Sequence, residues 1–203
     1  MTSNKDRLSS LEAEVQELRK LLLAKDQEVK DLQNEVNQLQ SYGRRKNLRI
    51  HGLPPAKKKD KETNEEVMEI VKKVHEETGV KFDESKIYRA HRVGKPKKDK
   101  NGKMTHSVIV KFIDWKSRCD LYRARPTMKK KVKDKSFGSI GLDLTKKNLE
   151  LLEKAREYAA KDESGVAFAC ADINCRLSVR FKNGNVKFFT NIDELDDIFK
   201  FIN

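Results

Sequence analysis

The sequence predicts an α+β protein that begins with a coiled coil, and two observations carry this prediction. Apolar residues recur at alternating spacings of three and four over residues 8–39, which is the heptad pattern of a coiled coil. Beyond this stretch, short strand-like and helix-like runs follow in the order β-α-β-β-α-β and then α-β-β-α. We therefore expect a coiled coil at residues 1–43, an α+β domain at 44–143 and a small α/β C-terminal domain at 144–203.

The heptad register is set by Leu8 at an a position. Lys25 is the charged exception at d, where it lowers stability and can set the oligomeric state. Mixed Val and Leu at a with Leu at d favours two parallel strands and is compatible with three. A single amphipathic helix packed on the globular part fits less well, because the apolar stripe is narrow and strictly 3.5-periodic. The residues expected to mediate self-association are Leu11, Val15, Leu18, Leu22, Val29, Leu32, Val36 and Leu39.

The first half of the α+β domain begins with an alternating strand at residues 48–51. Leu48 and Ile50 are expected to face inward, and Arg49 and His51 to face away from the core. Thr63-Asn-Glu-Glu66 is a capping box that predicts a helix ending at Gly79.

The second half is expected to hold a strand over 86–93, a basic loop over 95–103 and a strand over 108–112. Asp114 is placed to cap the next helix, and a last strand is expected around Ser139 to Leu142.

The C-terminal domain is predicted to be a helix, a β-hairpin and a closing helix. Thr145 can cap the first helix. The run Cys175–Phe181 alternates strongly, Asn183-Gly184 is a hairpin signal, and Val186–Phe189 is the return strand. Asp193 is expected to cap the closing helix. Alone, this part is near the lower size limit for a core, so we expect it to pack on the preceding domain.

Positive charge is concentrated after the coiled coil. The 203 residues carry a net charge of +13, with 45 Lys and Arg against 32 Asp and Glu. Residues 1–43 hold six basic and eight acidic side chains, a net −2, so residues 44–203 hold 39 against 24, a net +15. Such an excess predicts attraction to a polyanion through phosphate contacts and counterion release.

Other classes of protein find little support in the sequence. The chain has no apolar run of membrane-spanning length, and no apolar h-region of a signal peptide. We therefore expect no membrane association and a cytoplasmic location. The three cysteines form no C-x-x-C, so neither a metal site nor a cofactor is expected. Phosphate-loop, nucleophile-elbow and zinc-protease motifs are missing, which argues against an enzyme.

Basic clusters are the dominant functional signal. Arg89 and His91 share one strand parity, as do Arg176 and Arg180, so each pair can project from one sheet face. For a single cluster, a solvated charged face is the usual explanation, but several clusters in two small domains favour nucleic acid. Further candidates for phosphate contact from these clusters are Arg44, Arg45, Lys46, Arg49, Lys95, Lys129 and Lys130.

Two further sets of residues bear on this reading. The basic cluster of the helix expected after Asp114 includes Arg118 as well as Arg123 and Arg125. The runs Lys57–Lys61 and Lys95–Lys100 resemble nuclear localisation signals, which points to an additional nuclear location. Aromatic candidates for base stacking are Tyr88, Phe112, Tyr122 and Phe137.

The ordered motifs "NLRIHGLP", "IYRAHRVGKPK", "SVIVKF", "RARPTMKKK" and "LDLTKKNLELLEKAREYA" resemble a known family. The chain from residue 44 onward is similar to the RNA-binding protein of the first open reading frame of LINE-type non-LTR retrotransposons. Baculovirus few-polyhedra (FP) proteins share a related core. The resemblance implies an RNA-recognition-motif-like (RRM-like) domain at 44–143. It also implies that Arg89, Arg92, Arg123 and Arg125 contact RNA, together with the C-terminal arginines Arg176 and Arg180.

These observations predict a non-enzymatic, self-associating protein that binds single-stranded RNA or DNA and forms ribonucleoprotein. The resemblance implies chaperone-like activity and trimers, whereas the heptad residues favour a dimer, and both oligomers stay open. The alternative is a non-enzymatic coiled-coil adaptor of FP-like or domesticated origin. Its basic surface would meet an acidic protein partner.

Overall fold

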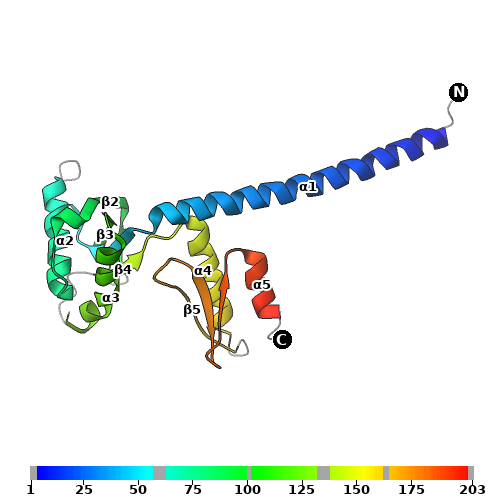
Figure 1. Ribbon diagram of the computed structural model, residues 1–203. Helices are drawn as coiled ribbons and strands as arrows, with labels where there is room; N and C mark the ends of the chain where they lie inside the picture. The colour runs from blue at the N-terminus through cyan, green and yellow to red at the C-terminus, as the bar shows by residue number, and fades with distance from the viewer. Residues whose placement is uncertain (1–3, 57–62, 100–101, 132–137, 162–164, 201–203) are drawn as a thin grey trace. The chain divides into compact units, whose positions relative to one another are not determined.

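The computed structural model describes residues 4–56, 63–99, 102–131, 138–161 and 165–200 (Figure 1). The protein is of mixed α and β structure, and the chain divides into two compact units, residues 1–40 and 41–203. No described helix has both the length and the apolarity needed to cross a membrane.

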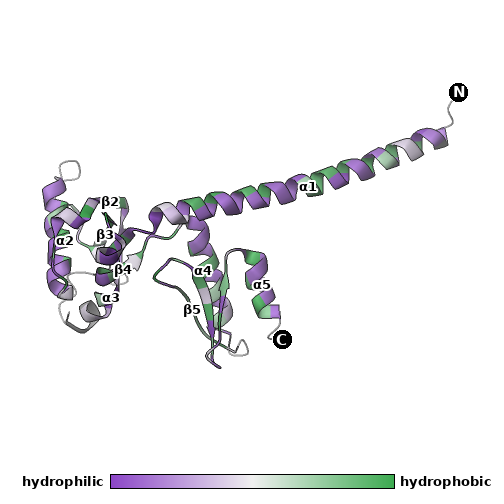
Figure 2. Ribbon diagram, in the orientation of Figure 1, coloured by the Kyte–Doolittle hydropathy of each residue, from purple (hydrophilic) through white to green (hydrophobic). Residues whose placement is uncertain are grey.

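The first unit is formed by a single helix, α1, whose last turn belongs to the second unit. α1 runs over Asn4–Arg44, one residue past Gly43. Figure 2 shows apolar and polar bands repeating along the helix. The eight apolar heptad residues predicted to mediate self-association are each between 44% and 65% exposed. An apolar stripe that gains no burial within its own chain leaves hydrophobic surface for a partner to cover.

The first sheet of the second unit is four-stranded and antiparallel, in the order β2-β3-β1-β4. Its strands are β1 (Asn47–Leu53), β2 (Ile87–Lys98), β3 (Met104–Phe112) and β4 (Ser139–Leu142). Leu48 and Ile50 are fully buried, which confirms the predicted parity of β1. β2 extends further than predicted, because Lys95–Lys98 lie in the strand and not in a loop.

Two helices connect these strands and lie side by side (Figure 1). They are α2 (Asn64–Thr78) and α3 (Trp115–Lys131), and a short 3-10 helix, η1 (Glu84–Lys86), precedes β2. The predicted capping box is confirmed, since Thr63 Oγ1 accepts from Glu66 N and Glu66 Oε2 accepts from Thr63 N. Gly79 ends α2 in the left-handed conformation (φ +75°). Asp114 caps α3 by accepting from Ser117 N at 2.8 Å.

The core of this part lies between the sheet and the two helices. Val67, Val71 and Val74 of α2 pack against Val108 and Val110 of β3 and their neighbours. The other face of the sheet contributes none of these core residues. It is called the open face below.

Two glycines allow β1 and β4 to approach closely. Gly52 has φ +75°, and a Cβ there would stand 2.6 Å from the Cα of Gly138. A Cβ on Gly138 would in turn stand 2.6 Å from the carbonyl oxygen of His51. No larger side chain fits at either position without moving backbone.

The remaining elements form a second sheet covered by two helices. They are α4 (Lys146–Ala159), β5 (Val166–Ala171), β6 (Leu177–Phe181), β7 (Val186–Phe189) and α5 (Ile192–Lys200). The strands are antiparallel in the order β5-β6-β7. A separate hydrophobic core includes Leu151, Val179 and Leu195.

The C-terminal prediction was right for the hairpin and wrong in two details. The α-β-β-α prediction missed β5, which pairs with β6 along its length. Thr145 caps α4 as predicted, but α5 is capped by Asn191, whose Oδ1 accepts from Glu194 N at 2.8 Å. Asp193 lies inside the first turn of the helix instead.

Candidate nucleic-acid interface

The second sheet carries alternating apolar and basic side chains along β6. Leu177 and Val179 are buried against the helices. Arg176 and Arg180 have the opposite parity and are exposed. Because successive side chains of a strand point to opposite faces, both arginines lie on the face away from the core. The predicted pairing of these two arginines on one face is confirmed.

Two phenylalanines lie on the same face as these arginines. Phe168 of β5 is paired with Arg180, and Phe188 of β7 is paired with Ser178. Phe168 is 47% exposed and Phe188 is 49% exposed. Two large rings half open to solvent on one small sheet are unusual for core-building residues, and they are available for stacking.

Each exposed ring is covered on one side by an arginine. The guanidinium carbon of Arg176 lies 4.4 Å from the ring centroid of Phe188, and that of Arg180 lies 5.6 Å from the centroid of Phe168. Arg176 is further held by Asp172, whose Oδ2 accepts from its Nε at 2.8 Å and from Nη2 at 2.7 Å. We call these four side chains, Phe168, Phe188, Arg176 and Arg180, the aromatic face.

The open face of the first sheet is also basic. Strand pairing places Arg89, Lys111 and Asn47 in one row across β2, β3 and β1, and the next row holds His91, Ile109 and Arg49. The predicted common face of Arg89 and His91 is thus confirmed. The phenol ring of Tyr88 lies on this side: it is 69% exposed, and Lys111 Nζ lies 5.1 Å from its centroid.

The histidines of the open face are partly shielded from water. His51 Nδ1 lies 3.2 Å from Ser107 Oγ, and His91 Nδ1 is buried with no hydrogen-bond partner among the described residues. Burial lowers the pKa of both imidazoles below the usual value, and the neighbouring Arg49 or Arg89 lowers it further. Both shifts favour the uncharged form of the ring at neutral pH.

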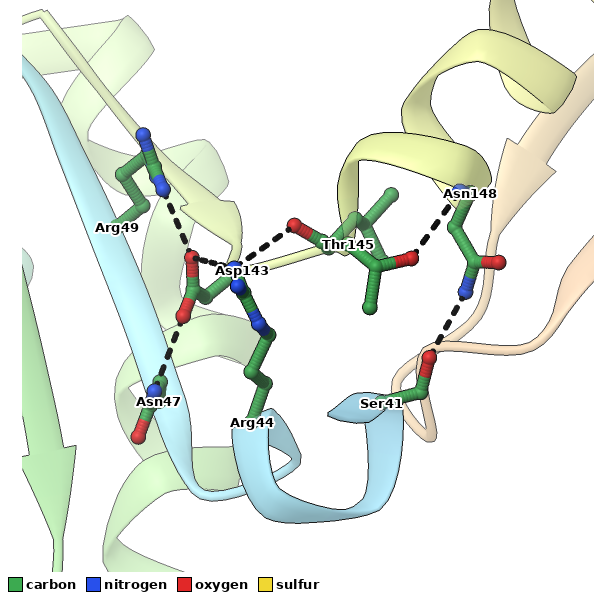
Figure 3. A network of polar contacts seen from close by, with 8 residues as sticks. Ser41, Arg44, Asn47, Arg49, Asp143, Thr145 and Asn148 are labelled. Atoms are coloured by element: carbon green, nitrogen blue, oxygen red, sulfur yellow. Dashed lines mark hydrogen bonds and ion pairs between the residues drawn. The ribbon is translucent and has the colours of Figure 1, made fainter. Parts of the chain in front are cut away.

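A buried carboxylate, Asp143, holds two of the predicted phosphate-contacting arginines (Figure 3). Its side chain is 2% exposed. Arg49 Nη2 donates to Oδ1 at 2.9 Å, and Asn47 Nδ2 donates to Oδ2 at 3.0 Å. Arg44 Nη1 lies 3.5 Å from Oδ1 and also donates to the carbonyl oxygen of Leu144.

The same joint extends into α4. Asn148 Nδ2 donates to Ser41 Oγ at 3.1 Å, and Asn148 N donates to Thr145 Oγ1 (Figure 3). The end of α1, β1 and the start of α4 are thereby tied together. Arg44 and Arg49 have a structural role here, although their side chains are still 38% and 27% exposed.

The other predicted basic residues of the first sheet and its flanks are dispersed. Arg45 stacks on Tyr42 at 3.6 Å, and Lys46 Nζ donates to the carbonyl oxygen of Ile113. Arg92 has the parity of the core side, and its Nη1 donates to the carbonyl oxygen of Pro54 at 2.7 Å. The sheet therefore separates Arg92 from Arg89.

The basic residues of α3 differ among themselves. Arg123 is exposed, whereas Arg125 stacks on Tyr122 at 3.9 Å and donates to its carbonyl oxygen. Lys129 and Lys130 fall within α3, but their side chains lie outside the described residues, as do Phe137 and the run Lys57–Lys61.

Arg118 does not belong to a surface cluster, contrary to the sequence prediction. It is fully buried, and its Nη1 donates to the carbonyl oxygen of Ile173 at 2.6 Å. Its Nη2 lies 3.7 Å from Cys175 Sγ. Cys175 sits in a left-handed turn (φ +64°), where burial raises the pKa of its thiol and Arg118 partly opposes that rise. Arg118 thus ties α3 to the β5–β6 turn.

The aromatic predictions need a similar correction. Phe112 is 1% exposed and Tyr122 is 8% exposed, so neither ring can stack on a base. Phe168 and Phe188 were missed. For Phe188 the available signal was its place in the predicted return strand Val186–Phe189, whereas the run "VAFACA" around Phe168 shows no clear alternation in the sequence.

Comparison with models of known protein families and with curated proteins finds no match for this chain. The retrotransposon resemblance therefore stays a prediction. Within the described residues, no group of three or more His, Cys, Asp or Glu side chains is arranged to hold a metal ion.

Proposed function

We propose that this protein binds single-stranded RNA or DNA, associates with itself through α1 and forms ribonucleoprotein, without catalysing a reaction. The observation that carries the proposal is the aromatic face, with two half-exposed rings each flanked by an arginine. In a single strand the bases are free to stack on such rings, and the flanking phosphates are matched by guanidinium groups.

The first sheet supports the same function by its arrangement. The element order β1-α2-β2-β3-α3-β4 and the strand order β2-β3-β1-β4 support an RRM-like fold for this part of the chain, and such folds bind nucleic acid on the open sheet face. Tyr88 is the exposed ring described on that side, so the open face offers little surface for base stacking. Arg89 and Lys111 are therefore assigned to backbone phosphate.

Self-association would multiply a modest affinity per protomer. The exposed apolar stripe of α1 supports a parallel coiled coil of two or three chains. Several linked sites on one strand raise the apparent affinity by about 10²–10⁴ without any new contact.

The same stripe also suits a foreign helix, as in the adaptor alternative. Sedimentation of residues 1–43 at micromolar concentration separates the two readings. A stable homo-oligomer supports self-association, and a monomer supports the adaptor.

The retrotransposon first-ORF assignment rests on the ordered motifs beginning with "NLRIHGLP". Its test is genomic: a reading frame for a reverse transcriptase with an endonuclease is expected immediately downstream.

The aromatic face is tested by Phe168→Ala with Phe188→Ala, measured by filter binding of a single-stranded oligonucleotide over a salt series. Base stacking contributes at least about 1 kcal/mol per ring, so the double variant should bind at least about 30-fold more weakly. Phe168→Tyr with Phe188→Tyr keeps both rings and should bind like the parent. Leu149→Ala removes a similarly exposed apolar side chain elsewhere and should have no effect.

Thermal unfolding of every variant checks that the fold is intact, which we expect because both rings are half exposed. Equal affinity of the alanine variant and the parent would reject the aromatic face. Absence of any binding by the parent at low salt would reject the proposed function as a whole.

A further inference from the structure

β2 and β3 continue past the first sheet as a two-stranded ribbon. The last pairing between β1 and β3 is Leu53 with His106. Beyond that point β2 and β3 pair only with each other, through Lys97 with Thr105 and Lys98 with Met104. We call the described part of this ribbon, residues 94–99 and 102–105, the basic arm.

Burial of apolar side chains does not explain why the basic arm forms an ordered ribbon. None of its described residues is buried, and Lys95, Lys97, Lys98 and Lys103 are all exposed. Neither hydrophobic core includes any residue of the arm. Ordering a ribbon costs conformational entropy, which a buried apolar surface would normally offset.

The arm is nevertheless held in a defined shape. Asp99 N donates to the carbonyl oxygen of Lys103 at 2.9 Å, and Lys103 N donates to Asp99 Oδ1 at 2.9 Å. At its base the register shifts between Val93 and Lys97, and His106 Nε2 donates to the carbonyl oxygen of Gly94 at 2.8 Å. A bulge bends the strand that carries it and increases its local twist.

The chemistry of the arm differs from that of the aromatic face. Its described residues include four lysines and no aromatic ring. Lysine is a compact point charge that suits phosphate, and an arm without rings offers no stacking surface for the unstacked bases of a single strand. Such a surface suits a duplex, whose bases are stacked inside and whose phosphates line the outside.

We propose that the basic arm is a second nucleic-acid contact, specific for double-stranded DNA and separate from the single-strand site. The major groove of B-form DNA is about 12 Å wide and admits a two-stranded β-ribbon. The major groove of A-form RNA is too deep and narrow for one. The arm lies in the DNA groove with its lysines on the bordering phosphates, and it contributes little to binding duplex RNA.

The test is fluorescence anisotropy with the full-length chain and three probes of one sequence: duplex DNA, duplex RNA and single-stranded RNA. The arm variant carries Lys95→Gln, Lys97→Gln, Lys98→Gln and Lys103→Gln. The control variant removes the same charge from exposed lysines outside the arm, through Lys72→Gln, Lys73→Gln, Lys81→Gln and Lys154→Gln.

The arm variant should bind duplex DNA at least about tenfold more weakly than the control variant does. The slope of log affinity against log salt should fall by about 0.9 for each lysine that contacts a phosphate. Affinity for single-stranded RNA should match that of the control.

Three outcomes would overturn the proposal. They are no binding of duplex DNA by the parent, an equal loss of duplex DNA binding in the arm and control variants, and an equal loss for duplex RNA and duplex DNA. Loss of single-strand binding in the aromatic-face variant is a separate result, so the two sites succeed or fail independently.

Discussion

Replacing Asp143 by alanine removes the acceptor on which the joint between β1 and α4 depends. A charge-assisted hydrogen bond contributes about 1.5–3 kcal/mol. The bond to Arg49 falls at the low end because that arginine is 27% exposed, and the contact with Arg44 at 3.5 Å adds about 0.5 kcal/mol. With the bond from Asn47, the three contacts sum to about 3 kcal/mol.

The alanine variant no longer bears the desolvation cost of the buried Asp143 carboxylate, which offsets part of this loss. The net destabilisation should therefore be about 2 kcal/mol. For a chain of this size, that lowers the melting temperature by about 4–8 °C. The matched control is Glu150→Ala, which breaks an exposed ion pair with Lys146 at 3.7 Å and should change stability by less than about 0.5 kcal/mol.

Thermal and urea unfolding of both variants measure the difference. If Asp143→Ala were no less stable than Glu150→Ala, the reasoning about the joint would be wrong. Binding is a second readout, measured where both variants are folded. Releasing Arg44 and Arg49 should raise single-strand affinity by up to about fivefold at 0.1 M salt, as one added phosphate contact would. A lower affinity would show that the joint itself is needed for binding.

Three further predictions follow from features described above. The folded state holds the pKa of His51 and His91 below the usual value of about 6.5, so the unfolded chain binds more protons at acidic pH. Stability should therefore be full above about pH 6.5 and fall as the pH drops towards the folded-state pKa values. Urea midpoints from about pH 7.5 to 5 measure this dependence, and a flat profile would contradict it. Leu22→Glu at an a position should shift sedimentation towards monomer and weaken apparent RNA binding by about 10² or more, and an unchanged oligomer would exclude α1 as the interface. Gly52→Ala should cost at least about 2 kcal/mol in chemical unfolding, because its Cβ would meet backbone 2.6 Å away, whereas Gly43→Ala, with nothing within 4 Å, should be neutral or stabilising.

Local patterns predicted much of the fold. The capping box at Thr63, the cap at Thr145 and the parity of β1 depend on residues within one or two turns or one strand, so sequence spacing alone identifies them. β5 was missed because "VAFACA" is apolar or small at every position, and its alternation appears only when β6 is paired beside it. The exposed Phe168 was missed for the same reason.

Contacts between residues far apart in the sequence decide which basic residues are exposed, and sequence patterns do not predict such contacts. An arginine in a basic cluster looks the same in sequence whether it meets water or protein. Arg118 is buried because Ile173, 55 residues later, supplies a carbonyl oxygen. Arg49 is held because Asp143, 94 residues later, supplies a carboxylate. No periodicity connects residues so far apart, so the division of the basic residues into structural and exposed sets requires the tertiary structure.

The contact between Ser41 and Asn148 spans 107 residues, and this has a consequence for synthesis on the ribosome. At about 5–20 residues per second, Asn148 is made about 5–20 s after Ser41. During that interval the heptad segment is complete, while the end of α1 has neither Asn148 nor Asp143 to hold it. A helix relaxes in about a microsecond, so α1 has time to form long before its base is fastened. Under the proposed self-association through α1, chains on one messenger RNA would associate while they are still being made, before either sheet is complete.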